Sequence, residues 1–106
     1  MIKELFIEKD WHRDGEIFHH KQVYNDGNYY IYEVTYGCSK WHEVFKRKLA
    51  KDVTKVDGRP MRIDSEHVKY PSNEDFGNWA FGYNTFDECI ECIKKWSQSS
   101  GIDVHL

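Results

Sequence analysis

The chain has 106 residues, which accommodates one domain, and its 40% hydrophobic and 31% charged residues exclude a disordered or low-complexity chain. A mean hydropathy of −0.80 and the absence of a long apolar run exclude a membrane-spanning helix. The formal net charge of −3 and a pI near 6.0 argue against a nucleic-acid-binding domain of the usual basic kind. Aromatic residues are unusually frequent, at 16%.

The first half of the chain predicts strands joined by tight turns. Residues 2–8 alternate loosely and predict a first strand, and residues 16–24 predict a second. In a regular strand, one face of this second segment carries Phe18, His20, Gln22 and Tyr24. The sequence Asn25-Asp26-Gly27 is typical of a hairpin turn, because Asn and Gly tolerate the positive φ that a tight reversal requires.

Residues 28–36 are the strongest strand candidate, being rich in β-branched and aromatic residues. One face of this strand carries Tyr30, Tyr32, Val34 and Tyr36. A turn over residues 37–40 follows, and residues 41–50 then predict a further strand of the meander. In that strand one face carries Trp41, Phe45 and Leu49, and the other carries Val44, Lys46 and Lys48.

Residues 51–83 have weaker patterns. Asp57-Gly58 indicates a turn, Pro60 argues against a central strand there, and short strands are predicted at 61–63 and 67–70. Ser72 and Asp75 have the spacing of a capping box, which indicates one helical turn within a loop. The alternation of large and small residues over 79–83 predicts a strand whose core face carries Trp79, Phe81 and Tyr83.

The C-terminal segment predicts an amphipathic helix of three to four turns. Thr85 and Glu88 form a capping box at its start, and Gly101 is the expected stop. One arc of the helix carries Phe86, Cys89, Ile90, Ile93 and Trp96.

These elements predict an α+β fold in a single domain, residues 1–106: an antiparallel meander of four to six strands with the helix on one face. The predicted core consists of Leu5, Ile7, Phe18, Tyr30, Tyr32, Val34, Phe45, Leu49, Trp79, Phe81, Phe86, Ile90, Ile93 and Trp96.

The three cysteines allow several interpretations. Their odd number and the lack of a secretory signal favour a reduced, cytoplasmic compartment. Cys89-x-x-Cys92 has redox or zinc-binding spacing, but it begins at the fourth helical position and its first thiol belongs to the apolar arc. Core packing is therefore favoured, while a zinc site completed by Cys38 or a histidine stays open. No nucleotide-binding glycine pattern or nucleophile elbow occurs, so no cofactor and no catalytic residue is predicted.

Charge is uneven along the chain. Residues 40–69 hold nine basic and five acidic residues, a net of +4, whereas the remainder has a net of −7. If the helix covers one face of the sheet only, the other face exposes aromatic and basic side chains, a composition typical of protein-binding surfaces. The candidate partner-binding residues are Tyr29, Trp41, Lys46 and Lys48.

The sequence therefore predicts a small soluble binding or inhibitory module without enzymatic activity that acts through another protein. Its size suggests, by analogy alone, an accessory protein of a mobile element of the phage type. One alternative is a nucleic-acid-binding module that uses Lys46, Lys48, Lys51 and the sheet tyrosines. Another is a metal-binding or enzymatic protein. No membrane partner is predicted, and the sequence leaves the oligomeric state and the partner's identity open.

Overall fold

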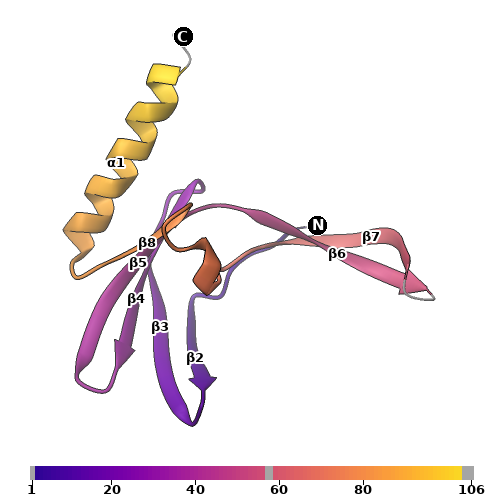
Figure 1. Cartoon of the computed structure of the whole chain (residues 1–106), viewed down its shortest axis with the longest axis horizontal. Helices are drawn as coiled ribbons and strands as arrows, with labels where there is room; N and C mark the ends of the chain where they lie inside the picture. Colours follow the sequence, from indigo (N-terminus) through magenta and orange to yellow (C-terminus); the bar gives the residue numbers. More distant parts are fainter. Residues whose placement is uncertain (1, 57–58, 104–106) are drawn as a thin grey trace.

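The computed structural model describes the backbone of residues 2–56 and 59–103 and the side chains of residues 2–51 and 66–98. It confirms the α+β fold: a five-stranded antiparallel sheet carries the C-terminal helix α1 (Phe86–Asp103) on one face (Figure 1). The strand order is β2-β3-β4-β5-β8, which comprise Glu8–Arg13, Glu16–Asn25, Tyr29–Tyr36, Ser39–Lys46 and Ala80–Tyr83. A second sheet has the order β1-β7-β6, formed by Ile2–Lys3, Arg59–Val68 and Leu49–Val56.

Three tight hairpins generate the meander β2-β3-β4-β5. Gly27 at φ +89° and Gly37 at φ +57° occupy the predicted turns, where a side chain would strain the backbone. The Asp26 carboxylate stabilises the first of these turns by accepting two backbone N–H bonds of 2.8 Å. A third turn at Asp14 and Gly15, both with positive φ, joins β2 to β3. The strand β2 was not predicted, although Asp-Gly is itself a hairpin signal.

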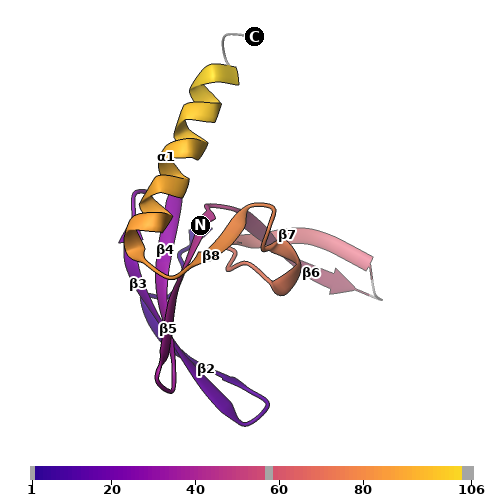
Figure 2. The ribbon, with the colours of Figure 1, turned by 60° about the vertical axis from the view of Figure 1, so that its left-hand side comes forward.

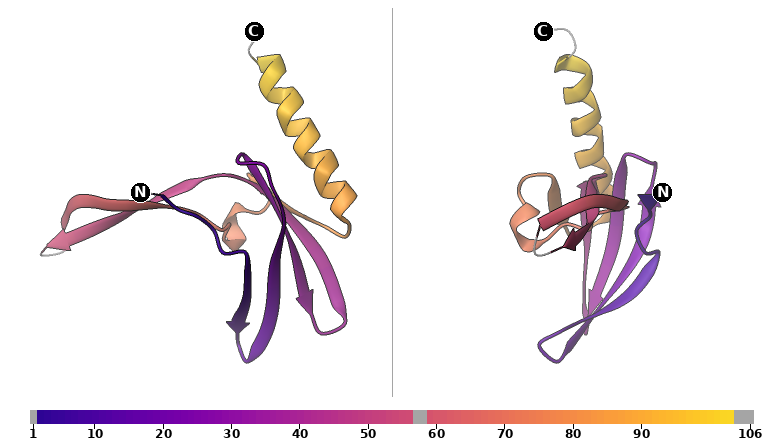
Figure 3. Two further views of the ribbon diagram at one scale, coloured as in Figure 1. Left: turned by 180° about the vertical axis from the view of Figure 1, so that it is seen from behind. Right: turned by 90° about the vertical axis from the view of Figure 1, so that its right-hand side faces the viewer.

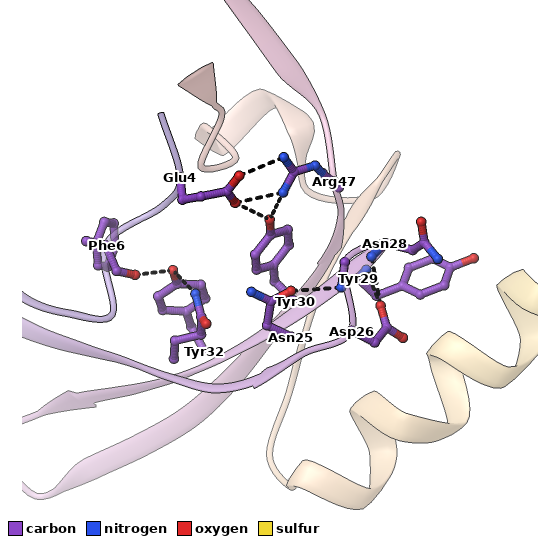
Figure 4. A network of polar contacts seen from close by, with 11 residues as sticks. Glu4, Phe6, Asn25, Asp26, Asn28, Tyr29, Tyr30, Tyr32 and Arg47 are labelled. Carbon is purple, nitrogen blue, oxygen red and sulfur yellow. Dashed lines mark hydrogen bonds and ion pairs between the residues drawn. The ribbon is translucent and has the colours of Figure 1, made fainter. Parts of the chain in front are cut away.

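The N-terminal segment differs from the predicted strand over residues 2–8. Only Ile2–Lys3 forms a strand, and residues 4–7 instead cross the sheet face, where polar contacts hold them (Figure 4). Arg47 donates to both carboxylate oxygens of Glu4 at 2.8 and 2.9 Å, and the Tyr32 hydroxyl donates to the Phe6 carbonyl at 2.5 Å. The Gln22 backbone N–H also donates to the Ile7 carbonyl at 2.7 Å, so side-chain and backbone groups of the sheet together hold this segment. Ile7, predicted in the core, is 65% exposed.

Two irregularities move aromatic side chains away from their predicted faces. The register between β3 and β4 shifts between Gln22 and Tyr24, and this bulge places Tyr24 against the helix-side core rather than beside His20. Trp79 precedes β8 and contacts the core on the opposite side from Phe81 and Tyr83. Strict alternation therefore fails at both places because a local irregularity changes the side-chain period.

The predicted strand over residues 41–50 is divided between the two sheets. It ends at Lys46, and Leu49 begins β6, where the Leu49 side chain is 44% exposed rather than in the core. The short strands predicted at 61–63 and 67–70 form one strand, β7, which ends at Val68. Pro60 lies in the part of β7 that pairs with β6 alone, so it occupies an edge position as expected for proline. The predicted Asp57-Gly58 turn lies outside the described residues.

Each face of the five-stranded sheet has its own core. The helix-side core contains Ile31, Val44, Cys89, Cys92 and Ile93. The other core contains Tyr30, Tyr32, Phe45, Val68 and Ala80, with Leu5, Phe6 and Tyr70 packed against it. Successive residues of β4 alternate between these two cores, so Tyr30, Ile31, Tyr32 and Val34 are buried and the other residues of the strand are half-buried.

Helix α1 begins as predicted. The Glu88 N–H donates to the Thr85 hydroxyl and the Thr85 N–H donates to the Glu88 carboxylate, both at 3.2 Å. Phe86, predicted in the core, is 36% exposed because it lies in the first turn at the edge of the packed stripe. The helix also continues through Gly101, the expected stop, to Asp103.

Two parts of the chain stand away from the five-stranded sheet: the β6–β7 hairpin and the C-terminal part of α1 (Figures 2 and 3). The radius of gyration is 16.2 Å, whereas a compact chain of this length has about 13 Å. The molecule is therefore more extended than its length requires.

Candidate functional site

The structure distributes the four predicted partner-binding residues over different surfaces. Tyr29 and Lys46 are directly paired across β4 and β5 on the helix side. There the Tyr29 ring stacks on Trp96 at 5.6 Å between centroids, and Lys46 Nζ lies 5.1 Å from the Trp96 ring. Trp41 faces the opposite side of the sheet, and Lys48 lies over Trp79 at 5.7 Å. The four residues therefore do not form one surface, and among them only Trp41 lines the groove on the face that the helix leaves uncovered.

That uncovered face contains an open groove of about 760 Å³, here named the aromatic groove. One wall comes from β2, β3 and β5, and the other comes from the loop between β7 and β8, which includes the 3-10 helix η1 (Asn73–Asp75). Its volume falls in the range of sites that bind small ligands or side chains of a partner. The aromatic rings that line it are Trp11, Phe18, Trp41, Tyr70 and Phe76.

The rings of the groove are held by contacts with one another. Trp11, 37% exposed, packs edge-on to Tyr70 with centroids 5.3 Å apart. Phe18 stacks on Tyr36 at 4.6 Å and meets Trp41 edge-on at 6.4 Å. Because Trp11, Phe18, Trp41 and Tyr70 are fixed by neighbouring rings, a ligand that enters the groove meets largely ordered side chains.

The loop that forms the second wall is also locally fixed. Ser72 donates both its backbone N–H and its hydroxyl to the Asp75 carboxylate, at 2.8 and 3.0 Å, and the first of these bonds belongs to the predicted capping box. These bonds keep the pKa of Asp75 below its ordinary value, and Lys69 lies 3.5 Å from the same carboxylate. The wall is therefore ordered by charge-assisted hydrogen bonds.

Glu43 is the central polar group of the groove. It lies on β5, half-buried, and accepts hydrogen bonds from Trp41 Nε1 at 3.0 Å and from the Tyr70 hydroxyl at 2.5 Å. Burial and the nearby carboxylate raise the pKa of Tyr70 far above its ordinary value, so the hydroxyl stays protonated and donates. Within the described part of the chain, no cationic side chain lies within 4.0 Å of Glu43.

His20 lies at the base of the groove and is buried among aromatic rings. Its Nδ1 lies 3.2 Å from the Phe18 carbonyl, and its ring centroid lies 5.1 Å from that of Trp11. Burial lowers the pKa of His20, because the surrounding rings cannot solvate an imidazolium. A neutral His20 then donates from Nδ1 to the carbonyl.

The cysteines of the predicted Cys-x-x-Cys motif belong to the helix-side core. Burial raises the pKa of Cys89 to about 12 and raises that of Cys92 as well, the opposite of the shift that a redox nucleophile needs. Cys38 is exposed in the β4–β5 turn. Among the described residues, no group of three or more histidines, cysteines or carboxylates is placed to hold a metal ion.

The basic residues from Lys46 to Lys69 whose side chains the structure describes do not all gather on one surface. Arg47 is bound to Glu4, Lys46 lies over Trp96, and Lys48 and Lys69 both lie over Trp79. The β6–β7 hairpin has four basic and four acidic residues over 49–68, so its formal charge cancels. Tyr30 and Tyr32 are fully buried and cannot stack on bases.

Comparisons with protein-family models, with curated proteins and with solved structures found no match for this chain. Within the described residues, no helix has the length and apolarity needed to cross a membrane. The groove therefore has to be interpreted from its own residues. Sequence reasoning identified Trp41 but missed Trp11, Tyr70, Phe76 and Glu43, since these belong to separate segments that only the fold brings together.

Proposed function

We propose that this protein is a binding module without enzymatic activity, and that it contacts another protein through the aromatic groove. The observation that carries the proposal is the set of five aromatic rings around one open groove on the face opposite α1. Aromatic side chains of this kind dominate the energetics of protein interfaces, because they bury a large area at small cost in conformational entropy.

The polar groups of the groove support binding more than proton transfer. The high pKa of Tyr70 keeps its proton on the hydroxyl, and that hydroxyl already donates to Glu43. Burial lowers the pKa of His20. A general acid or base works best with a pKa near the working pH, and the pKa values of Tyr70 and His20 are shifted upward and downward from their ordinary values instead.

The exposed area of the molecule also supports a partner. The accessible surface is 7579 Å², whereas a compact monomer of 12.7 kDa exposes about 6,200 Å². The excess of about 1,300 Å² is larger than the roughly 800 Å² that each partner buries in a protein–protein interface of standard size.

The test compares binding partners captured by the parent protein and by two variants. Trp11→Ala removes an exposed ring of the groove, and Ile17→Ala removes an exposed apolar side chain from the neighbouring strand, on the other face of the sheet. We expect a partner that is retained by the parent and by Ile17→Ala but lost, by quantitative mass spectrometry, from Trp11→Ala. Equal retention by both variants would refute the groove as the binding surface.

A further inference from the structure

The charge of Glu43 is not compensated by the surrounding protein. Its two described partners, the Trp41 indole N–H and the Tyr70 hydroxyl, are neutral donors. Each donor occupies one lone pair on a different carboxylate oxygen, so each oxygen can accept a second hydrogen bond. A half-buried carboxylate that has lost part of its hydration and lacks a counter-charge favours a cation that enters beside it.

The surroundings of Glu43 are suited to a flat cation. Trp41 and Tyr70, the two rings that hold the carboxylate, line the groove together with Trp11, Phe18 and Phe76. The faces of aromatic rings attract cations, and tryptophan does so most strongly. One ring of the groove already shows this preference, since Lys9 Nζ lies 5.0 Å from the Trp11 ring.

A guanidinium group matches both features at once. It is planar and weakly hydrated, so it can stack on an aromatic ring, and its parallel N–H groups can bind the two oxygens of a carboxylate together. A lysine ammonium can also lie over a ring, as Lys9 does over Trp11, but it is compact and strongly hydrated and cannot stack flat on a ring while it binds both oxygens of a carboxylate. Arginine is also among the residues most enriched at the centres of protein interfaces.

The net charge of the groove agrees with this choice. Its ionised lining groups are the carboxylates of Glu43 and Glu74 and the guanidinium of Arg13, and the only other lining residues that can become charged are His12 and His20. Burial lowers the pKa of His20, so its ring adds no positive charge at neutral pH. The lining therefore has a slight excess of negative charge around a central carboxylate.

We propose that the aromatic groove binds an arginine side chain of the partner protein, with the guanidinium paired to Glu43 and stacked among the groove's aromatic rings. This inference rests on the proposed function, because it names the chemical group by which the partner is recognised. It makes Glu43 the residue that determines specificity and makes the rings the source of affinity.

The test uses small probes, so it does not require the partner. N-acetyl-arginine amide is titrated into the ¹⁵N-labelled protein while the indole resonance of Trp41 is followed, and N-acetyl-citrulline amide is titrated as the neutral isostere. We expect a saturable shift with the arginine probe and at least about tenfold weaker binding of the citrulline probe, since the citrulline lacks the charge.

Variants then assign the effect to Glu43. Glu43→Gln should abolish the preference for arginine over citrulline, whereas Glu33→Gln, which removes a carboxylate from the helix side of the neighbouring strand, should leave the preference unchanged. If Glu43→Gln does not fold, the comparison of the two probes on the parent protein still decides the question.

Three results would overturn the inference: equal binding of arginine and citrulline probes, shifts confined to the helix side of the sheet, or stronger binding of N-acetyl-aspartate amide than of the arginine probe. The last result would indicate that Arg13 selects an anion instead. None of these results would by itself refute the proposed function, which is tested separately by the loss of a partner from Trp11→Ala.

Discussion

Replacing Cys89 or Cys92 with serine tests whether the Cys-x-x-Cys motif serves core packing. Cys89 has no exposed surface and lies in the helix-side core with Ile31 and Val44. Cys92 is 8% exposed, and the Tyr83 hydroxyl lies near enough to its thiol to oppose part of the rise in the Cys92 pKa that burial causes. A serine hydroxyl at position 92 therefore meets a polar partner, whereas a hydroxyl at position 89 is surrounded by apolar groups.

The expected difference follows from the desolvation of the hydroxyl. A buried hydroxyl without a partner costs about 1 to 3 kcal/mol by protein mutational data, so Cys89→Ser should destabilise the protein by about 2 kcal/mol. Unfolding entropy is about 2.1 cal/mol/K per residue, so this loss lowers the Tm of a chain of this length by about 9 °C. Cys92→Ser should cost less than about 1 kcal/mol, because a hydrogen bond can replace the lost packing.

Thermal and urea unfolding of the parent and both variants measure these differences, and the exposed Cys38 serves as the internal reference for thiol reactivity. In the folded parent, one thiol should react quickly with a disulfide reagent, and two should react only as the protein opens. Equal losses of Tm in the two variants would refute the packing argument. A fall of the parent's Tm on adding a chelator, absent in both variants, would indicate a metal site instead.

Three further predictions concern the helix, two neighbouring histidines and the molecular shape. Thr85→Ala should lower stability by about 1 kcal/mol through the lost cap, and an unchanged urea midpoint would contradict the observed helix start. Hydrogen bonds to Asp10 and Glu8 raise the pKa of His19, and burial lowers that of His20, so NMR titration should place the two midpoints on opposite sides of 6.5. The contribution of His19 to stability is therefore complete below pH 6.5 and is lost as the pH rises through the pKa of His19 in the folded protein. The contribution of the neutral His20 is complete above pH 6.5 and is lost as the pH falls through the pKa of His20 in the folded protein. Small-angle scattering of the monomer should give a radius of gyration near 16.2 Å, and a value near 13 Å, that of a compact chain of this length, would show that the β6–β7 hairpin folds back on the sheet.

Local sequence signals were sufficient to predict the structure wherever a few neighbouring residues determine the backbone conformation. The Thr85 capping box, the Gly27 and Gly37 turns and the alternation along β4 all act within four to ten residues, and each was predicted correctly. The α+β class followed from these elements, because an amphipathic helix must bury its apolar stripe against the sheet.

Non-local contacts decided the remaining features. Residues 4–7 lack a neighbouring strand over most of their length because Arg47 and Tyr32, far along the chain, bind them instead. The bulge in β3 moves Tyr24 to the other face, and no pattern within β3 reports a register that depends on pairing with β4.

The sequence by itself determined the fold class, the β3–β4 and β4–β5 hairpins and the helix, because these depend on turn chemistry, capping and periodicity over short distances. Only the tertiary structure decided the aromatic groove. Its rings come from positions 11 to 76, and Glu43 faces them because β5 pairs with β4 in one register and the β7–β8 loop lies across the same face. A site made by such pairing has no sequence signature, since the free energy that assembles it comes from packing between segments that are distant in the chain.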